Sequence, residues 1–365
     1  MTSAPSVPST ATHSARFGSG QHVRRLEDEP LLKGQGRYTD DVQPAAQTRL
    51  VLLRSPYPHA NIRSVDTSAA RTMPGVHLVV SGADLAAQGV LALAGAAGFA
   101  RADGKPVTSA PRHALAVDRV RFVGEAVAAV VADTVQQAKD AAEAILVDYE
   151  DLSAVVTPQA ALAQNAPLLC DAIADNIAAE MRHGSAAKTD EAFAVARHVV
   201  KLHIHNQRLN ALPIEPRTVL ADYADRGDGL RLHVQLSNQM PTAIREGILQ
   251  TLGKALGLTH KDVRVVLGDV GGGFGMKTGP YPEDIITAYC AHRLKRPVKW
   301  VAERSEEFLS TVAGRDVHVD AEMALAADGR ILALKVHSLA NIGAYATGAG
   351  VAIQLMIGPW VQSSV

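Results

Sequence analysis

The chain has 365 residues, which is enough for about two domains of ordinary size. Hydrophobic residues make up 47% of the sequence and charged residues 20%, both typical of a globular protein. The formal net charge is -1, and no long run of one sign is present. The charge therefore gives no reason to expect nucleic acid or an anionic membrane as a partner.

Cys170 and Cys290 are the only cysteines, and they lie far apart in the sequence. Two thiols cannot supply the ligands of a Cys₄ zinc site or of an iron–sulfur cluster. A chain of this length also has no need of a disulfide scaffold. We expect two buried, reduced thiols in a cytoplasmic protein.

The N-terminal stretch is rich in Ser, Thr, Pro and Ala and lacks the continuous apolar core of a signal peptide. No segment of the chain has the unbroken apolar run of about 18 residues that spans a bilayer. We predict a disordered tail over residues 1–22 and no membrane span.

Residues 23–157 alternate strand patterns with helix patterns, which predicts an α/β domain. The apolar run Ala126–Ala132 is typical of a buried strand. We expect Asp133 to cap the following helix in a capping box with Gln136, and a further strand over Ile145–Tyr149. The predicted apolar face of that helix consists of Val135, Ala138, Ala142 and Ile145.

The pattern weakens over residues 158–187, which we interpret as a linker, and returns over residues 188–365. Alternating apolar residues predict half-buried strands over residues 200–204 and 230–236, and a hairpin that turns at Asp328-Gly329. Val263–Val266 is predicted to be a buried strand. A four-residue apolar spacing predicts an amphipathic helix from Ile244, Ile248, Leu252 and Leu256.

A glycine run, Gly271-Gly272-Gly273-Phe274-Gly275, follows the last of these buried strands. One interpretation is a phosphate-binding P-loop, because residues 271–278 match G-x-x-x-x-G-K-[ST] except that Met276 replaces the last glycine. A P-loop also needs a helix to begin at the Lys-Thr pair. Here Pro280 and Pro282 interrupt the chain, and the helix is expected to begin near Glu283.

Two other interpretations of the run remain. The dinucleotide fingerprint G-x-G-x-x-G is not matched, because Gly275 comes one residue too early. The alternative is a loop whose backbone approaches a bulky polar ligand, with Phe274 presented as a wall. Consecutive glycines remove side-chain volume and permit positive φ, which such an approach requires. A plain tight turn needs only one glycine.

Other polar residues have ordinary explanations. Glu283 and Asp284 lie at a predicted helix start, where carboxylates interact favourably with the helix dipole, and we expect them to cap the helix. We interpret Arg304 and Glu306 as a surface ion pair or as cofactor or interface residues. A metal site formed by His203 and His205 alone is disfavoured. Five histidines are predicted on solvated strand faces: His203, His205, His233, His318 and His337.

The glycine run together with other segments resembles the molybdenum hydroxylase family, which includes the large subunits of xanthine dehydrogenase, aldehyde oxidoreductase and carbon monoxide dehydrogenase. The other matching segments, in chain order, are Ser55–Ala60, Phe122–Ala128, Glu215–Arg217, Arg296–Trp300 and Glu303–Glu306. The resemblance implies a hammerhead-like α/β domain over residues 23–157. It also implies the first part of a molybdopterin-binding α+β domain over residues 188–365.

The resemblance also implies a cofactor site. Gln239 matches a family glutamine that hydrogen-bonds the oxo side of a molybdenum–molybdopterin cofactor, in its plain or cytosine dinucleotide form. The family's loop at Gly272, Gly273, Phe274 and Gly275 packs against the cofactor, with the Phe274 ring in the substrate pocket. The pterin dithiolene supplies sulfur ligands, so no side chain of the chain is expected to coordinate the metal.

Partners follow from the same resemblance. In the family, an aldehyde or an aromatic N-heterocycle is hydroxylated with oxygen from water, and the electrons pass through two [2Fe–2S] clusters to FAD. Because this chain has too few cysteines, we expect an Fe–S subunit and a FAD subunit as partners. Purine-oxidising members have a glutamate where this chain has Thr278, which disfavours xanthine as the substrate.

The family's general-base glutamate is expected beyond Val365, so no catalytic residue is predicted within the chain. Without a positioned base, the rate falls by roughly 10² to 10⁴. We therefore expect a truncated product or one half of a split subunit, whose second chain carries the missing C-terminal half. The alternatives are a non-catalytic scaffold subunit without cofactor and a P-loop nucleotide-binding protein.

Overall fold

The computed structural model describes residues 25–227 and 229–362. The predicted disordered tail, residues 1–22, lies outside the described residues. The chain divides into two compact units, Met1–Arg37 and Tyr38–Val365. Within the first unit the described residues form α1 (Asp28–Leu32), a helix that buries none of its side chains. All remaining elements belong to the second unit.

The strands of the second unit are β1 (Thr48–Arg54), β2 (Ala60–Asp66), β3 (Val76–Ser81), β4 (Arg119–Val120), β5 (Ala126–Ala132), β6 (Leu146–Asp151), β7 (His198–Asn206), β8 (Thr218–Asp225), β9 (Leu230–Leu236), β10 (Val263–Val266), β11 (Val298–Val301), β12 (Val317–Leu325) and β13 (Ile331–Ala340). Its α-helices are α2 (Ser68–Arg71), α3 (Gly82–Ala87), α4 (Val135–Glu143), α5 (Pro158–Ala161), α6 (Ala186–Ala194), α7 (Pro241–Leu256), α8 (Pro282–Leu294), α9 (Arg304–Ser310) and α10 (Gly348–Gln362).

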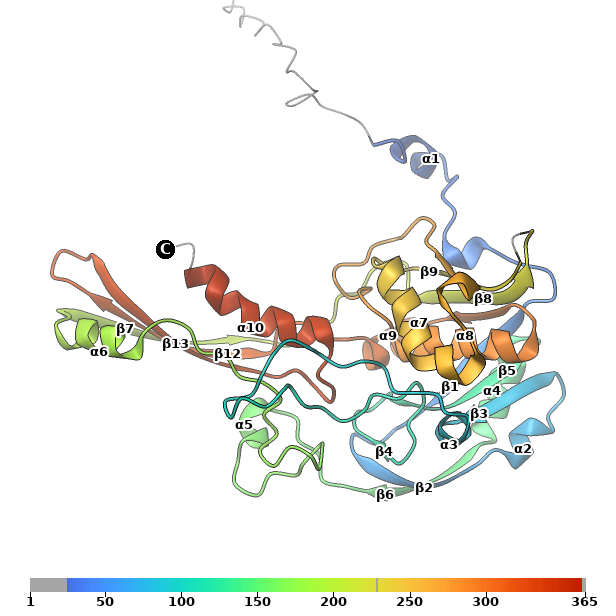
Figure 1. Ribbon diagram of the computed structural model, residues 1–365, viewed down its shortest axis with the longest axis horizontal. Coiled ribbons are helices and arrows are strands. Elements are labelled where there is room, and N and C mark those ends of the chain that lie inside the picture. Colours follow the sequence, from blue (N-terminus) through green and yellow to red (C-terminus); the bar gives the residue numbers. More distant parts are fainter. Residues whose placement is uncertain (1–24, 228, 363–365) are drawn as a thin grey trace, which may run out of the picture. The chain divides into compact units, whose positions relative to one another are not determined.

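One mixed sheet joins the regions that the sequence analysis separated. Its strand order is β10-β9-β8-β11-β1-β5-β3, so strands from residues 23–157 and from residues 188–365 are hydrogen-bonded side by side. The junction is the parallel pair of β1 and β11, in which Thr48 lies opposite Val298 (Figure 1). The fold is α/β, as predicted, and the boundaries of the two domains and of the linker stay a prediction.

Helices cover both faces of this sheet at β5. Ala128, Val130 and Ala132 pack with α4 residues on one side. Ala129 and Val131, which point the other way, join the cluster that contains α8. A strand covered on both faces needs apolar residues at every position, which explains the continuous apolar run. The predicted helix face is also confirmed for α7, where Ile244, Ile248 and Leu252 are fully buried.

Several local predictions were wrong by one residue or one face. Thr134, not Asp133, caps α4, because the Thr134 hydroxyl accepts from Gln137 N–H while the Asp133 carboxylate pairs with His77 at 2.7 Å. β10 is the edge strand of its sheet, so it buries only its first residue, Val263. Cys170 is only half-buried, whereas Cys290 is buried as expected.

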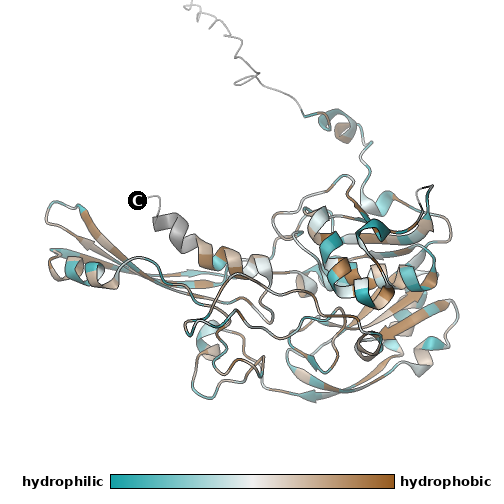
Figure 2. Ribbon diagram, in the orientation of Figure 1, coloured by the Kyte–Doolittle hydropathy of each residue, from teal (hydrophilic) through white to brown (hydrophobic). Residues whose placement is uncertain are grey.

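A second sheet has the order β13-β12-β7, and α6 packs on β13. The predicted turn between β12 and β13 is confirmed, with Gly329 at φ 85°. Figure 2 shows apolar and polar positions alternating along these strands. The prediction of half-buried strands fails for β7, however. Leu202 and its apolar neighbours are exposed, because no described element covers the face of the sheet that carries Leu202.

A third, small sheet has the order β4-β2-β6. No helix among the described residues combines the length and the apolar character needed to cross a membrane.

Candidate functional site

The glycine loop, residues 271–275, lies between the edge strand β10 and the start of α8. The helix begins at Pro282 and is capped by Tyr281, so no helix N-terminus faces the loop at Lys277 and Thr278. The Lys277 side chain is completely buried and points at Glu215 instead of into open space above the loop. Both observations exclude the arrangement that a P-loop needs.

A side chain at any of the three consecutive glycines would collide with a neighbouring group. A Cβ at Gly271 would lie 2.5 Å from the Glu215 Cβ, and one at Gly272 would lie 2.7 Å from the Phe274 ring. A Cβ at Gly273 would lie 2.5 Å from the amide carbon of Gln239. The run is therefore glycine because the side chains of Glu215, Phe274 and Gln239 lie directly against its backbone.

Gln239 is the predicted site residue that the fold brings to this loop. It follows β9, the strand next to β10, and its backbone N–H donates to Lys277 O at 2.8 Å. Its side-chain Oε1 accepts from Gly275 N–H at 3.1 Å. The side chain is exposed, and among the described residues its Nε2 has no hydrogen-bond partner. The loop thus orients Gln239 so that the amide NH₂ is directed toward solvent.

Phe274 adopts a backbone conformation that is rare for an aromatic residue, with φ 50°. Its side chain is 76% exposed. Exposure of a large apolar ring on a strained backbone is costly, and such strain is found preferentially at binding sites. The structure therefore brings Gln239, Gly272, Gly273, Phe274 and Gly275 to one surface, and their roles toward a cofactor stay predictions.

Beneath the loop lies a buried ion pair that the sequence analysis did not single out. Lys277 Nζ donates to Glu215 O at 2.9 Å, to Glu215 Oε2 at 3.0 Å and to the Ser237 hydroxyl. Glu215 Oε2 also accepts from Gly271 N–H at 2.7 Å. Burial lowers the pKa of Lys277, and Glu215 opposes that shift. The pair fixes the loop to the segment before β8, and the adjacent Glu-Pro-Arg motif was its only signal in the sequence.

Glu215 keeps one polar atom without a partner. Its Oε1 is buried and makes no hydrogen bond within the described part of the chain. An unpaired buried carboxylate oxygen beside a glycine loop is the kind of atom that a ligand donor or an ordered water satisfies.

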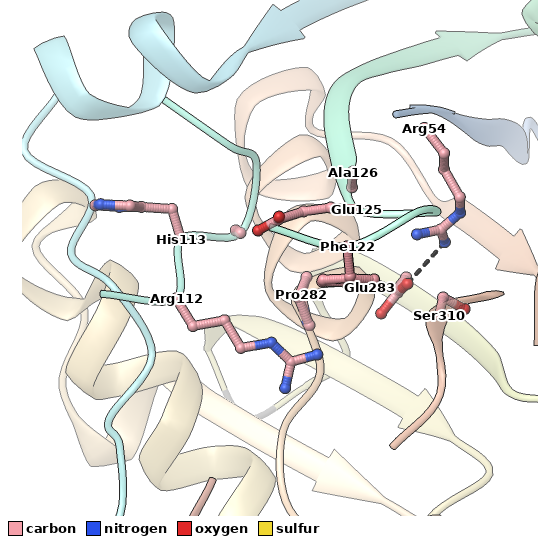
Figure 3. A pocket seen from close by; sticks show the side chains of 10 residues that line it. Arg54, Arg112, His113, Phe122, Glu125, Ala126, Pro282, Glu283 and Ser310 are labelled. Carbon is pink, nitrogen blue, oxygen red and sulfur yellow. Dashed lines mark hydrogen bonds and ion pairs between the residues drawn. The ribbon is translucent and has the colours of Figure 1, made fainter. Parts of the chain in front are cut away.

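A second buried network joins two of the segments that carry the family resemblance, through Arg217 and Glu306. Arg217 donates to Glu283 at 2.9 Å and to Glu307 at 3.0 Å. Arg54, on β1, contacts Glu283 and Glu306, each at 2.7 Å. Figure 3 shows the Arg54 guanidinium directed at Glu283 in a small pocket. The network links β1 to α8 and α9.

This network corrects two predictions. Glu283 does not act as a helix cap but is a buried partner of two arginines; Asp284 is the residue that accepts from Tyr281 N–H, at 2.8 Å. Glu306 pairs with Arg54 and not with Arg304, whose guanidinium donates to Ile214 O at 2.8 Å. Glu283 faces the guanidinium groups of Arg217 and Arg54 in the protein interior. The attraction between these opposite charges offsets the free energy that is needed to remove them from water.

The electrostatics of α8 follow from this packing. Burial favours the neutral form of Glu283, but Arg217 and Arg54 outweigh it and hold the pKa of Glu283 at about 2. Asp284 lacks such a direct partner, so burial raises the pKa of Asp284 to about 7, against the opposing effects of Tyr281 N–H and Arg217. The environments of these two adjacent carboxyl groups thus shift their pKa values in opposite directions.

The pocket of Figure 3 and the glycine loop are different places, because the pocket is lined by residues such as Arg112, Phe122 and Glu125. One predicted histidine position is also wrong. His233 is buried on β9, the strand next to the edge strand β10, and does not lie on a solvated face.

With this geometry in view, comparisons with known proteins identify the class. Residues 170–360 match the molybdopterin cofactor-binding domain. Residues 33–153 match the a/b hammerhead domain of aldehyde oxidase and xanthine dehydrogenase. The chain belongs to the molybdenum hydroxylase family.

Three relatives illustrate the match. The nicotine 6-hydroxylase large subunit of Paenarthrobacter nicotinovorans is 37% identical over 89% of this chain and 38% of its own length. The carbon monoxide dehydrogenase large chain of Hydrogenophaga pseudoflava is 32% identical over 94% of this chain and 42% of its own length. The crystal structure of quinoline 2-oxidoreductase from Pseudomonas putida 86 superposes with a TM-score of 0.76 at 34% identity, covering 88% of this chain and 39% of that one.

The chain thus spans about two fifths of the length of the curated relatives that it matches.

Proposed function

We propose that this chain binds a molybdenum–molybdopterin cofactor at the surface formed by Gln239 and the glycine loop, and contributes that surface to a molybdenum hydroxylase. The observation that carries the proposal is the bond from Gly275 N–H to Gln239 Oε1. This bond leaves the Gln239 amide NH₂ as a directed donor beside a stretch of backbone without side chains. A donor in that position suits an anionic or oxo ligand.

The residues present fit such a group. The glycines let a bulky ligand approach the backbone. Glu215 Oε1 is a buried acceptor that has no hydrogen-bond donor among the described residues. Residues 269–279 contain no cysteine and no histidine. This suits a metal whose sulfur ligands come from the pterin dithiolene and not from protein side chains. When bound, the cofactor supplies a metal that accepts two electrons while a substrate C–H becomes C–OH with oxygen from water.

The chain's own residues would bind the cofactor and orient the substrate. Gln239 Nε2 would donate a hydrogen bond to the bound group, because Gly275 N–H holds the other end of the amide, and Lys277 with Glu215 holds the loop in place from beneath. The exposed Phe274 ring offers a flat apolar face against which a planar substrate packs.

We infer that the substrate is an aldehyde or an aromatic N-heterocycle, and the heterocycle is favoured. The relatives include proteins named for nicotine and quinoline, both of which contain aromatic nitrogen rings. Thr278 cannot provide a carboxylate for a purine. Substrate hydroxylation releases two electrons, which pass to Fe–S and FAD groups on partner subunits, because the chain's two cysteines cannot ligate a cluster.

Relatives described as large subunits, large chains and a complex subunit support a heteromeric assembly. The partners that we propose are an Fe–S subunit and a FAD subunit. The two free thiols suit the reducing cytoplasm.

The reaction is tested on the native assembly. The chain is tagged in its own host, the complex is isolated, and a panel of aldehydes, N-heterocycles and purines is assayed in ¹⁸O-labelled water with an artificial electron acceptor. We expect a hydroxylated N-heterocycle that carries the label. Product oxygen derived from O₂, or an assembly with Fe–S and FAD subunits that oxidises none of these compounds, contradicts the proposal.

A further inference from the structure

A cluster of metal-ligating side chains lies far from the glycine loop in the sequence, at one end of the β7–β12 strand pair. His205 on β7 and His318 on β12 are directly opposite in the register, so both side chains leave the same face of the sheet. Their rings stack with centroids 4.0 Å apart. Asp316 immediately precedes β12. We propose that His205, His318 and Asp316 form a binding site for a divalent transition-metal ion, with Zn²⁺ as the best match.

The spacing of the donor atoms is close to what such an ion needs. One ligand atom from each of the three residues lies within 4.8 Å of the others. Metal–ligand bonds of about 2.0–2.1 Å place tetrahedral donors about 3.4 Å apart. The site therefore closes with side-chain rotations that move each donor by about 1 Å, and the half-exposed His205 ring is free to make them.

The carboxylate is held in place for this role. Asn341 Nδ2 donates to Asp316 Oδ2 at 2.9 Å, and Asn341 N–H donates to Asp316 O at 2.9 Å. The other carboxylate oxygen, Oδ1, lies 3.9 Å from His205 Nε2. Asp316 is thus fixed through one oxygen and directs the other toward the histidines, as carboxylate ligands with a supporting hydrogen bond do.

The neighbouring histidine shows the difference from an ordinary ion pair. His203 also lies on this face, but it has its own carboxylate, Asp320, at 2.7 Å. His205 and His318 share one carboxylate, and neither is within hydrogen-bond distance of it. The sequence pattern His203-x-His205 is therefore not the site; the second imidazole comes from β12.

The chemistry of the donors selects the ion. Two imidazoles and one carboxylate suit Zn²⁺, Co²⁺ or Ni²⁺, whereas Mg²⁺ and Ca²⁺ prefer oxygen ligands alone. One competing charge is present, because Arg208 Nη1 lies 3.5 Å from Asp316 Oδ2. The Arg208 side chain is half-exposed, so it can swing away at a cost to metal affinity. A bound ion would connect β7 to β12 at this end of the sheet.

The test uses the full chain without a polyhistidine tag. Apo-protein is titrated with Co²⁺, visible d–d absorption is recorded, and Zn²⁺ is then added as a competitor. We expect one Co²⁺ per chain with the bands of a low-coordinate site, displaced by Zn²⁺. His205→Ala and His318→Ala should each lower the affinity at least tenfold, and Asn341→Ala about 10- to 100-fold.

Two further variants make the test specific. Arg208→Gln removes the competing cation and should raise the affinity severalfold. His198→Ala is the matched control, because His198 lies on β7 but at its other end, and it should leave binding unchanged. Circular dichroism in the presence of EDTA verifies that each variant is folded. Equal binding by the wild type and the His205→Ala variant, or no binding by the wild type, overturns the proposal.

Discussion

The three consecutive glycines have different neighbours, and Gly273 is the one whose substitution separates site geometry from stability. The atoms nearest to a Cβ there belong to the flexible end of the Gln239 side chain, whereas at Gly271 the nearest atom is the Cβ of Glu215, next to the backbone. The Gln239 amide can move away, and the fold can remain. What is lost is the orientation of the amide, because its hydrogen bond to Gly275 no longer forms.

We therefore predict that Gly273→Ala lowers the free energy of unfolding by no more than about 1–2 kcal/mol. At the same time, the Gly275 amide should lose its protection from hydrogen exchange. Gly314→Ala is the control, because a Cβ there meets nothing within 4 Å. Retained protection at Gly275 in the Gly273→Ala variant would show that Gln239 is not held as described.

Asp284 gives a residue-scale prediction about pH. Its pKa rises from an ordinary value of 3.8 to about 7 on folding, mainly through burial, so the folded state binds this proton more tightly than the unfolded state. The contribution of Asp284 to stability is therefore full below pH 4 and is lost as the pH rises toward 7. Glu283 has the opposite sign: its contribution is present above about pH 4.5 and lost on acidification toward pH 2.

Asp284→Asn keeps an oxygen for the Tyr281 N–H and removes the ionisation. We expect this variant to exceed the wild type in free energy of unfolding at pH 8 by up to about 4 kcal/mol, and by much less at pH 4. Urea denaturation at both pH values measures the difference. A variant that is less stable than the wild type at pH 8 contradicts the assigned environment.

At the scale of elements, the two sheets differ in how their apolar residues are covered. Ile248 of α7 is fully buried in the main core, whereas Leu202 of β7 is 57% exposed. Ile248→Ala should cost about 2–5 kcal/mol, because it removes buried methyl groups and leaves a cavity. Leu202→Ala should change the free energy of unfolding by no more than about 0.5 kcal/mol. A large cost for Leu202→Ala in the purified chain would show that a further layer covers β7.

Sequence patterns predicted the elements well where one local period decides the structure. The α7 spacing, the β5 apolar run and the Asp328-Gly329 turn are examples, since each depends on neighbouring residues alone. The exposure of β7 was missed, because alternation indicates that a strand has an apolar face but does not indicate what lies against that face. The α4 cap was missed by one residue, because Asp133 is engaged by His77, a distant residue.

The site was harder to predict, because its contacts join residues that lie far apart in the sequence. The glycine run and Gln239 were found through the family resemblance, and their roles toward the cofactor remain predictions. The Lys277–Glu215 pair and the arginine network were not found. Their partners are separated by as many as 252 residues, as for Arg54 and Glu306, and no local pattern reports such a contact.

For the whole molecule, the Arg54 network is the connection that matters most. Arg54 extends from β1 to carboxylates of α8 and α9, and it is almost completely buried. We predict that Arg54→Met lowers the free energy of unfolding by about 3–5 kcal/mol, because it leaves the largely buried carboxylate of Glu306 without a cation and leaves Glu283 with Arg217 alone. Arg63→Met is the matched control, since Arg63 forms an exposed pair with Glu150, and it should cost less than about 1 kcal/mol. Similar losses for the two variants would contradict this role.

The central claim is that this chain carries a molybdenum–molybdopterin site at Gln239 and the glycine loop. The most direct measurement is the molybdenum and pterin content of the complex that is purified through this chain from a molybdate-supplied host. We predict that molybdenum and pterin are recovered together in equal amounts, and that Gly273→Ala removes most of both while Gly314→Ala removes neither. A complex that retains its Fe–S and FAD subunits but contains no molybdenum or pterin would contradict it and identify a scaffold instead.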